Sequence, residues 1–246
     1  MFRVRGFLVA GLASALASAC MANRAVRPPV ASVFVIGGIH QAHEQAKKYT
    51  YERMGELGDH LRPDVLLVEA EQKFLDDGSD SGMPRDFATF MVPSARRRGV
   101  PIVGIDWWDE EKGRRWEELQ QQAFSDPELA VDAALIGGMF QLLDAYFVES
   151  DFEEINAAEI TALWEAKSEL KYAVYRRHPA YRFLAAFERE RNDHMADNIL
   201  AALAHHPDKR ALVAVGIDHK YYLERELRRR GVRVLTVAEV MAEWWR

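Results

Sequence analysis

Two apolar segments near opposite ends of the chain finish with the same pattern: a glycine, two further residues and a histidine. The first is Val33–His40 (VFVIGGIH) and the second is Ala211–His219 (ALVAVGIDH). Continuous apolar, β-branched runs are typical of strands that are covered on both faces of a parallel sheet. Because parallel strands end at the same edge of a sheet, the pattern predicts that both histidines lie at that edge, where open α/β sheets bind ligands.

The rest of the sequence predicts further strands and helices of the same kind of fold. Apolar strand patterns alternate with helix patterns towards both ends of the chain, as in βα units. The other expected strands are Val65–Val68, Pro101–Ile105 and Val232–Val237; the expected helices are Gln41–Leu61, Arg85–Arg98 and Lys220–Arg230, with a loop at Phe74–Pro84. We therefore predict an α/β fold, a mostly parallel sheet with flanking helices.

The centre of the chain has a different character, because almost no strand pattern occurs between Glu110 and His206. The helices expected there are Lys112–Phe124, Pro127–Glu149, Phe152–Tyr172 and Tyr181–His206, with Asp-Pro and His-Pro breaks between some of them. We interpret residues 110–206 as a helical insertion in, or a cap over, a single domain that spans residues 33–246.

The N-terminus is predicted to be a secretory signal covering residues 1–19. Arg3 and Arg5 form a basic region, Phe7–Leu16 is a short apolar stretch, and Ala17–Ala19 has the small residues of a cleavage site. The apolar stretch is too short for a transmembrane helix. Residues 20–32, which include two adjacent prolines, are expected to form a tether.

Cys20 follows the predicted cleavage site directly and is the only cysteine in the sequence. This junction resembles a bacterial lipoprotein signal, in which the cysteine becomes the lipidated first residue. The usual leucine stands one place early, at Leu16, so ordinary cleavage after Ala19 is the alternative. We expect an exported protein, a periplasmic or outer-membrane lipoprotein that meets the membrane through a lipid anchor at Cys20. A net charge of −6 gives no electrostatic reason to expect a nucleic acid partner.

Polar residues stand at the end of four predicted strands: His40, Glu69, Asp106 and His219. Imidazole and carboxylate groups are ordinary ligands of Zn²⁺ and Mn²⁺, and such an ion acidifies a bound water into a nucleophile. Without a metal, the same groups can serve as general base and acid. A single histidine at a strand end is most often only a capping or hydrogen-bonding residue, so the prediction depends on their common placement.

Arg191 lies one helical turn before Met195, so we expect it on the inward face of its helix. An inward arginine usually pairs with a carboxylate, here Glu69 or Asp106, or it stabilises an anionic transition state; a structural ion pair is the alternative. His43 is expected on the solvated surface. Trp107 and Trp108 are expected either to wall a pocket or to pack under the central helices.

These motifs resemble a known family when they are taken in chain order. Gly37–His40, a strand ending in glutamate (Val65–Glu69), an Arg-Asn-x-x-Met-Ala helix (Arg191–Ala196) and Gly216–His219 are similar to the TraB/TIKI group. That group belongs to a wider superfamily with erythromycin-esterase-like and ChaN-like proteins. The resemblance covers the two ends of the domain well and its helical centre only in outline.

The resemblance implies a metal-dependent, peptidase-like hydrolase that acts on a peptide or small molecule. His40, Glu69 and His219 would hold a divalent ion (Zn, Mn or Co), with Glu69 as ligand or base and with Asp106 and Arg191 as further catalytic residues. The alternative is a ChaN-like lipoprotein that binds haem or iron without turnover. A third alternative is a relative whose site is inert.

Overall fold

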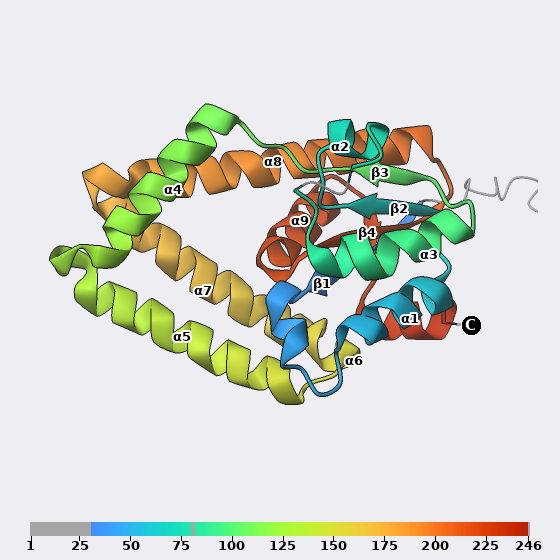
Figure 1. The fold of residues 1–246 in the computed structure, drawn as a ribbon, viewed down its shortest axis with the longest axis horizontal. Coiled ribbons are helices and arrows are strands. Elements are labelled where there is room, and N and C mark those ends of the chain that lie inside the picture. Colours follow the sequence, from blue (N-terminus) through green and yellow to red (C-terminus); the bar gives the residue numbers. More distant parts are fainter. Residues whose placement is uncertain (1–30, 80–81, 246) are drawn as a thin grey trace, which may run out of the picture.

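The computed structural model describes residues 31–79 and 82–245, and its centre is a five-stranded sheet (Figure 1). The strands are β1 (Ser32–Gly38), β2 (Val65–Val68), β3 (Ile102–Gly104), β4 (Arg210–Gly216) and β5 (Arg233–Val234). They all run parallel, in the spatial order β3-β2-β4-β1-β5. The predicted α/β fold with a mostly parallel sheet and flanking helices is confirmed.

The register of β1 and β4 brings the two Gly-x-x-His motifs side by side. Gly38 pairs with Gly216 at the last position of the ladder. Strand β2 pairs with the other side of β4, and Val68 lies opposite Ala214. Because parallel neighbours end together, the residues that follow β1, β2 and β4 all reach one edge of the sheet. The prediction that both motifs end at one edge of the sheet is therefore confirmed.

Alternate residues of each strand pack against different layers, as strand geometry requires. On one face, Phe34, Ile36, Leu66 and Val68 pack with residues of α1 (Tyr51–Leu61), of the π-helical turn η2 (Asp86–Met91) and of α3 (Val92–Arg97). On the other face, Val33, Val35 and Leu67 pack with the C-terminal half of α8 (Arg182–His205) and with α9 (Ile217–Arg229). The sheet edge is thus held rigidly between two apolar layers.

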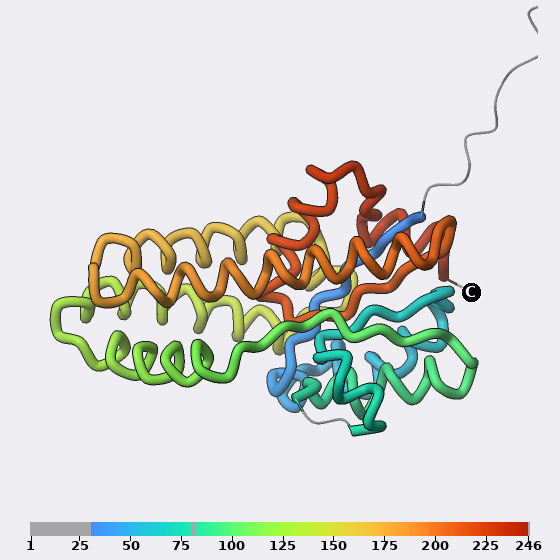
Figure 2. The backbone as a smooth tube through the Cα atoms, turned by 90° about the horizontal axis from the view of Figure 1, so that it is seen from above, coloured from blue at the N-terminus to red at the C-terminus, as the bar shows by residue number. Residues whose placement is uncertain are grey.

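Four long helices extend beyond the sheet as one elongated arm (Figure 2). They are α4 (Glu110–Ser125), α5 (Ala130–Glu149), α7 (Ala158–Arg177) and α8, joined by the short elements η3 (Pro127–Leu129), α6 (Phe152–Ile155) and η4 (Pro179–Tyr181). A small separate core of Ala123, Leu129, Val174, Tyr181 and Leu184 holds the far end of this arm together. The helices expected between residues 110 and 206 are therefore present, with one of them divided.

Helix α5 carries apolar side chains on its outer surface. Val131, Leu135 and Leu142 are 84%, 55% and 75% exposed. By length and composition, Pro127–Glu149 is the one helical segment in the described residues that is apolar enough to cross a membrane.

Several predicted helix boundaries were wrong for local reasons. The expected helix Gln41–Leu61 is a 3₁₀ turn, η1 (His40–Glu44), followed after a break by α1, because the Thr50 side chain accepts a hydrogen bond from Arg53 N and starts a new helix. The expected loop Phe74–Pro84 begins within a short helix, α2 (Gln72–Asp76). The expected helix Arg85–Arg98 opens with the π turn η2 ahead of Pro93, which lacks a backbone N–H.

Two other differences come from side chains that cap the backbone. The expected helix Phe152–Tyr172 divides at Asn156, whose side chain accepts a hydrogen bond from the N–H of Gly37 in β1 (2.8 Å). The expected strand Val232–Val237 is only β5, because Thr236 forms a capping box with Glu239 and starts α10 (Val237–Glu243).

Candidate functional site

Glu69 lies at the centre of the sheet edge, directly after β2. Its Oε2 accepts a 2.6 Å hydrogen bond from the backbone N–H of Gly216, so the carboxylate bridges β2 and β4. The side chain is almost fully buried. Burial would raise the pKa of this carboxyl, but its neighbours, led by His219 and Arg191, hold that pKa well below its ordinary value of 4.5. Glu69 is therefore a fixed anion.

His219 lies in the first turn of α9, and both of its ring nitrogens have a partner. Nδ1 is 2.6 Å from Asn192 Oδ1. Nε2 is 3.3 Å from Arg191 Nη1 and 3.5 Å from Glu69 Oε1. Asn192 Oδ1 accepts a hydrogen bond from Nδ1–H, while Nε2 has both the Arg191 guanidinium and the Glu69 carboxylate beside it. These neighbours fix the orientation of the ring.

His40 is the first residue of η1 and has a left-handed backbone, with φ of 48°. Its Nδ1 lies 3.2 Å from both oxygens of Asp86, and its backbone N–H is 3.3 Å from Asp86 Oδ2. Burial would lower the pKa of His40, but the Asp86 carboxylate outweighs that effect and raises this pKa above its ordinary value of 6.5. A strained residue tied to a buried anion is typical of functional sites.

Nε2 of His40 faces Gly216. A Cβ placed on Gly216 would overlap His40 Nε2 and would lie 3.4 Å from Glu69 Oε2, so both groups meet above this glycine. A glycine at such a position permits either a close approach of another group to the backbone or a positive φ. The described glycines with positive φ are Gly78, Gly82, Gly99 and Gly231, so close approach is the property that Gly216 supplies.

The sequence did not single out Asp86. Its side chain is fully buried and contacts two histidines, His40 and His43. The prediction that His43 is a solvated surface residue was wrong: its Nδ1 donates a 2.6 Å hydrogen bond to Tyr49 O, and its Nε2 is 3.4 Å from Asp86 Oδ2. In a 3₁₀ turn, residues three apart lie on the same side, so His40 and His43 both contact the Asp86 carboxylate.

Arg191 reaches the site from the middle of α8, on its inward face as predicted. Its Nε and Nη2 each donate a 2.8 Å hydrogen bond to Asp106, and Nη2 also lies 3.0 Å from Glu69 Oε1. Burial would lower the pKa of Arg191, but its hydrogen bonds to Asp106 and the charge of Glu69 raise it. Both carboxylates that were predicted as alternative partners, Asp106 and Glu69, therefore pair with the Arg191 guanidinium.

Two cavities open beside these residues. The larger, about 820 Å³, is lined by His40, whose side chain is 41% exposed. The smaller, about 260 Å³, is lined by Trp108, Arg191 and His219. Trp107 instead stacks on His194, with ring centroids 4.2 Å apart. Of the two predicted roles for the tryptophans, Trp108 thus walls a pocket, and Trp107 packs against a central helix.

The site residues are of the types that bind a divalent ion. A ligating histidine usually donates its other ring N–H to an oxygen, and Nδ1 of both His40 and His219 lies beside one. Nε2 of His219 has Arg191 Nη1 at 3.3 Å and Glu69 Oε1 at 3.5 Å. Within residues 31–79 and 82–245, no three His, Cys, Asp or Glu side chains are grouped to hold a metal. The Zn, Mn or Co ion stays a prediction.

Comparison of the chain with protein-family models, curated proteins and solved structures found no match to any of them. The resemblance to the TraB/TIKI group therefore stays a prediction. The predicted signal of residues 1–19, Cys20 and the tether up to residue 30 lie outside the described residues.

Proposed function

We propose that this chain is a hydrolase that cleaves an ester or amide bond, with His40 as the general base. The observation that carries the proposal is the contact of His40 Nδ1 with the buried carboxylate of Asp86. A histidine whose Nδ1–H is held by a carboxylate presents the lone pair of Nε2 outward, ready to accept a proton. Here Nε2 lies at the sheet edge, beside the fixed anion Glu69.

The reaction follows from these positions. His40 Nε2 accepts a proton from a water molecule while the water oxygen bonds to the carbonyl carbon of the substrate. The carbonyl oxygen takes up the electron pair of its π bond and becomes an oxyanion. When the tetrahedral intermediate collapses, the bond to the alcohol or amine breaks, and protonated His40 returns the proton to that leaving group. Atoms and charges balance without any other reactant.

Arg191 supplies the positive charge that such an oxyanion needs. Its hydrogen bonds to Asp106 and Glu69 fix the guanidinium, and it lines the cavity of about 260 Å³. A preorganised cation stabilises developing negative charge without reorganisation during the reaction. Asp106 holds Arg191 in place, and Asn192 holds His219. We assign positioning roles to Asp106 and Asn192.

The resemblance to TraB/TIKI proteins favours the same reaction class, because that group contains peptidases and its superfamily contains lactone-opening esterases. It leaves the substrate open between a peptide and a small molecule. A panel of activated esters and fluorogenic peptides, tested on the chain from Met21 onward, is the direct experiment.

The panel compares wild type with His40→Ala and with His205→Ala, an exposed histidine at the end of α8 that serves as the matched control. We expect His40→Ala to lower kcat/KM by roughly a hundredfold or more, the usual size of a general-base contribution. His205→Ala should match wild type. No turnover by wild type, or full activity in His40→Ala, overturns the proposal.

Metal analysis and haem titration separate the alternatives. Near-stoichiometric Zn, Mn or Co that is lost in a His40→Ala/His219→Ala double variant, with activity that a chelator removes, would replace the metal-free mechanism by a metal-dependent one. A haem absorption band that depends on His40, without hydrolysis of any substrate, would favour the binding-protein alternative instead.

A further inference from the structure

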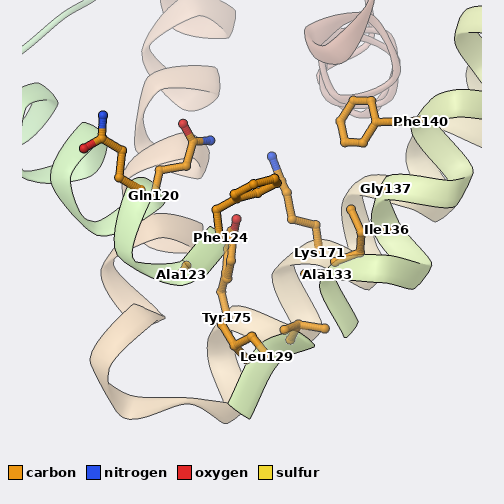
Figure 3. Close-up of a pocket in the computed structure, with 12 residues that line it drawn as sticks. Gln120, Ala123, Phe124, Leu129, Ala133, Ile136, Gly137, Phe140, Lys171 and Tyr175 are labelled. Carbon is orange, nitrogen blue, oxygen red and sulfur yellow. The ribbon is translucent and has the colours of Figure 1, made fainter. Parts of the chain in front are cut away.

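A third cavity, with a mostly apolar lining, lies in the helical arm next to the site. It has a volume of about 430 Å³, within the roughly 300–1,000 Å³ usual for small-molecule sites. Figure 3 shows it between α4, α5 and α7, with Phe124, Leu129, Ile136 and Phe140 around it.

This cavity adjoins the smaller cavity of the site. Both are lined by Gln120, Phe140 and Lys171, so the same three side chains form the boundary between them. On its other side, the smaller cavity reaches Arg191 and His219. The two cavities therefore adjoin, and together they extend from Arg191 and His219 to an apolar groove of the arm that is open to solvent beside Phe124, which is 85% exposed.

The mostly apolar lining of the arm cavity favours binding of a molecule that has no polar groups along its length. Four of its lining residues have polar side chains, namely Gln120, Gln121, Lys171 and Tyr175. The Lys171 amino group is already paired with Glu188 at 2.6 Å. A peptide in the cavity would bring an N–H and a C=O with every residue, and unpaired polar groups cost free energy when buried. An unbranched hydrocarbon chain carries no such cost.

We infer that the substrate is a long-chain acyl ester or acyl amide, with its acyl chain in the arm cavity and its carbonyl group between His40 and Arg191. This inference rests on the proposed hydrolase function. The sequence resemblance alone does not lead to an acyl chain.

Two adjacent glycines of α5 provide a matched pair of variants. A Cβ on Gly137 or on Gly138 would meet no atom within 4 Å, so both positions accept a larger side chain. Gly137 lines the arm cavity, and Gly138 does not. Replacing a glycine inside a helix with leucine also favours the helix, so both variants should fold. Gly137→Leu therefore fills the cavity, and Gly138→Leu controls for the substitution itself.

The experiment measures kcat/KM for p-nitrophenyl dodecanoate and p-nitrophenyl acetate in wild type and both variants. We expect wild type to prefer the long chain. Gly137→Leu should lower kcat/KM for dodecanoate by about tenfold, because each methylene that loses its burial costs roughly fourfold. Hydrolysis of the acetate should be unchanged, and Gly138→Leu should resemble wild type. Equal selectivity in Gly137→Leu and wild type overturns the inference while leaving the hydrolase proposal intact.

A binding measurement keeps the two proposals separate. Fluorescence of cis-parinaric acid, an unbranched fatty acid, reports occupation of the arm cavity without turnover. We expect it to bind the inactive His40→Ala protein and to bind His40→Ala/Gly137→Leu about tenfold more weakly, again from lost methylene burial. Such binding without any hydrolysis by wild type would reject the hydrolase and keep the acyl-chain cavity. Absence of binding in every variant would reject the cavity assignment.

Discussion

The imidazole of His40 lies against the backbone of Gly216, so the first Gly-x-x-His motif supplies a ring and the second supplies the space for it. This contact joins the ends of β1 and β4, which are neighbours in the sheet. Glu69, from the other side of β4, binds the N–H of the same glycine. The glycine of the second motif is thus as much a part of the site as its histidine.

Gly216→Ala tests this relationship with the smallest change available. Gly216 has φ of −56° and ψ of 143°, a region that alanine also adopts, so the substitution causes no backbone strain. The new methyl group instead displaces the His40 ring. We expect kcat/KM to fall at least about tenfold, since a misplacement of about 1 Å can cost a hundredfold. Gly138→Ala, in open space, is the control; equal activity in both would show that the His40 position is unimportant.

Asp86→Asn tests the pairing that makes His40 a base. The amide keeps the shape and can still accept from Nδ1–H, but it loses the negative charge. We expect kcat/KM to fall by about 10–100-fold, the usual effect of losing such a partner.

The pH profile of the same variant tests the charge of Asp86. The Asp86 carboxylate raises the pKa of His40 above 6.5, and the base must be unprotonated, so the acid limb of the wild-type pH profile lies above pH 6.5. In Asp86→Asn this limb should move to lower pH; an unmoved limb would assign it to another group.

The stability of the protein in acid should depend on the same carboxylate. Burial would raise the pKa of Asp86, but its hydrogen bonds to His40 and His43 lower that pKa from 3.8 to about 2. A lowered folded-state pKa contributes stability that is present above pH 3.8 and is lost as pH falls towards 2. Urea unfolding between these pH values should show a steeper loss of stability in wild type than in Asp86→Asn. Parallel curves would contradict this linkage.

Arg191→Lys separates the charge of the arginine from its geometry. A lysine keeps the positive charge but cannot form the two hydrogen bonds to Asp106 together with the contact to Glu69. We expect a loss of about 3 kcal/mol in the free energy of unfolding, as for a disrupted buried ion pair, and a loss of roughly a hundredfold in kcat/KM. Urea unfolding and steady-state kinetics measure the two effects. Wild-type activity in Arg191→Lys would reduce its role to charge alone.

The sequence could predict the residues that a sheet edge brings together. His40, Glu69 and His219 each follow an apolar strand, and parallel strands end together whatever the details of their packing. Helical spacing was enough to put Arg191 on the inward face of α8. The positions of these residues depend on hydrophobic periodicity and on the order of the elements, and both can be recognised in the sequence.

The partners that fix those residues could not be predicted in the same way. Asp86 stands 46 positions from His40, in a segment that reads as an ordinary helix start, where acidic residues are common. His43 is buried only because a 3₁₀ turn, rather than an α-helix, follows His40. The arm cavity depends on how α4, α5 and α7 pack at a distance from the sheet. Such contacts are set by tertiary packing and leave no periodic pattern.

Lys167→Met tests a buried charge that anchors α7 to the start of α9. The Lys167 side chain is fully buried, 2.5 Å from Asp218 and 3.5 Å from the Trp164 ring centroid. Burial lowers the pKa of this lysine from 10.5 to about 8, despite the opposing charge of Asp218. Between these pH values the unfolded chain binds the extra proton, so this group's contribution to stability rises with pH.

Methionine keeps the volume, and Asp218 is half exposed, so the Lys167→Met variant should be at least as stable as wild type at pH 7. Its advantage, up to roughly 3 kcal/mol by the size of the shift, should shrink as pH approaches 10.5. The exposed Lys209→Met is the control, and a stability difference that does not change with pH would show that Lys167 keeps an ordinary pKa.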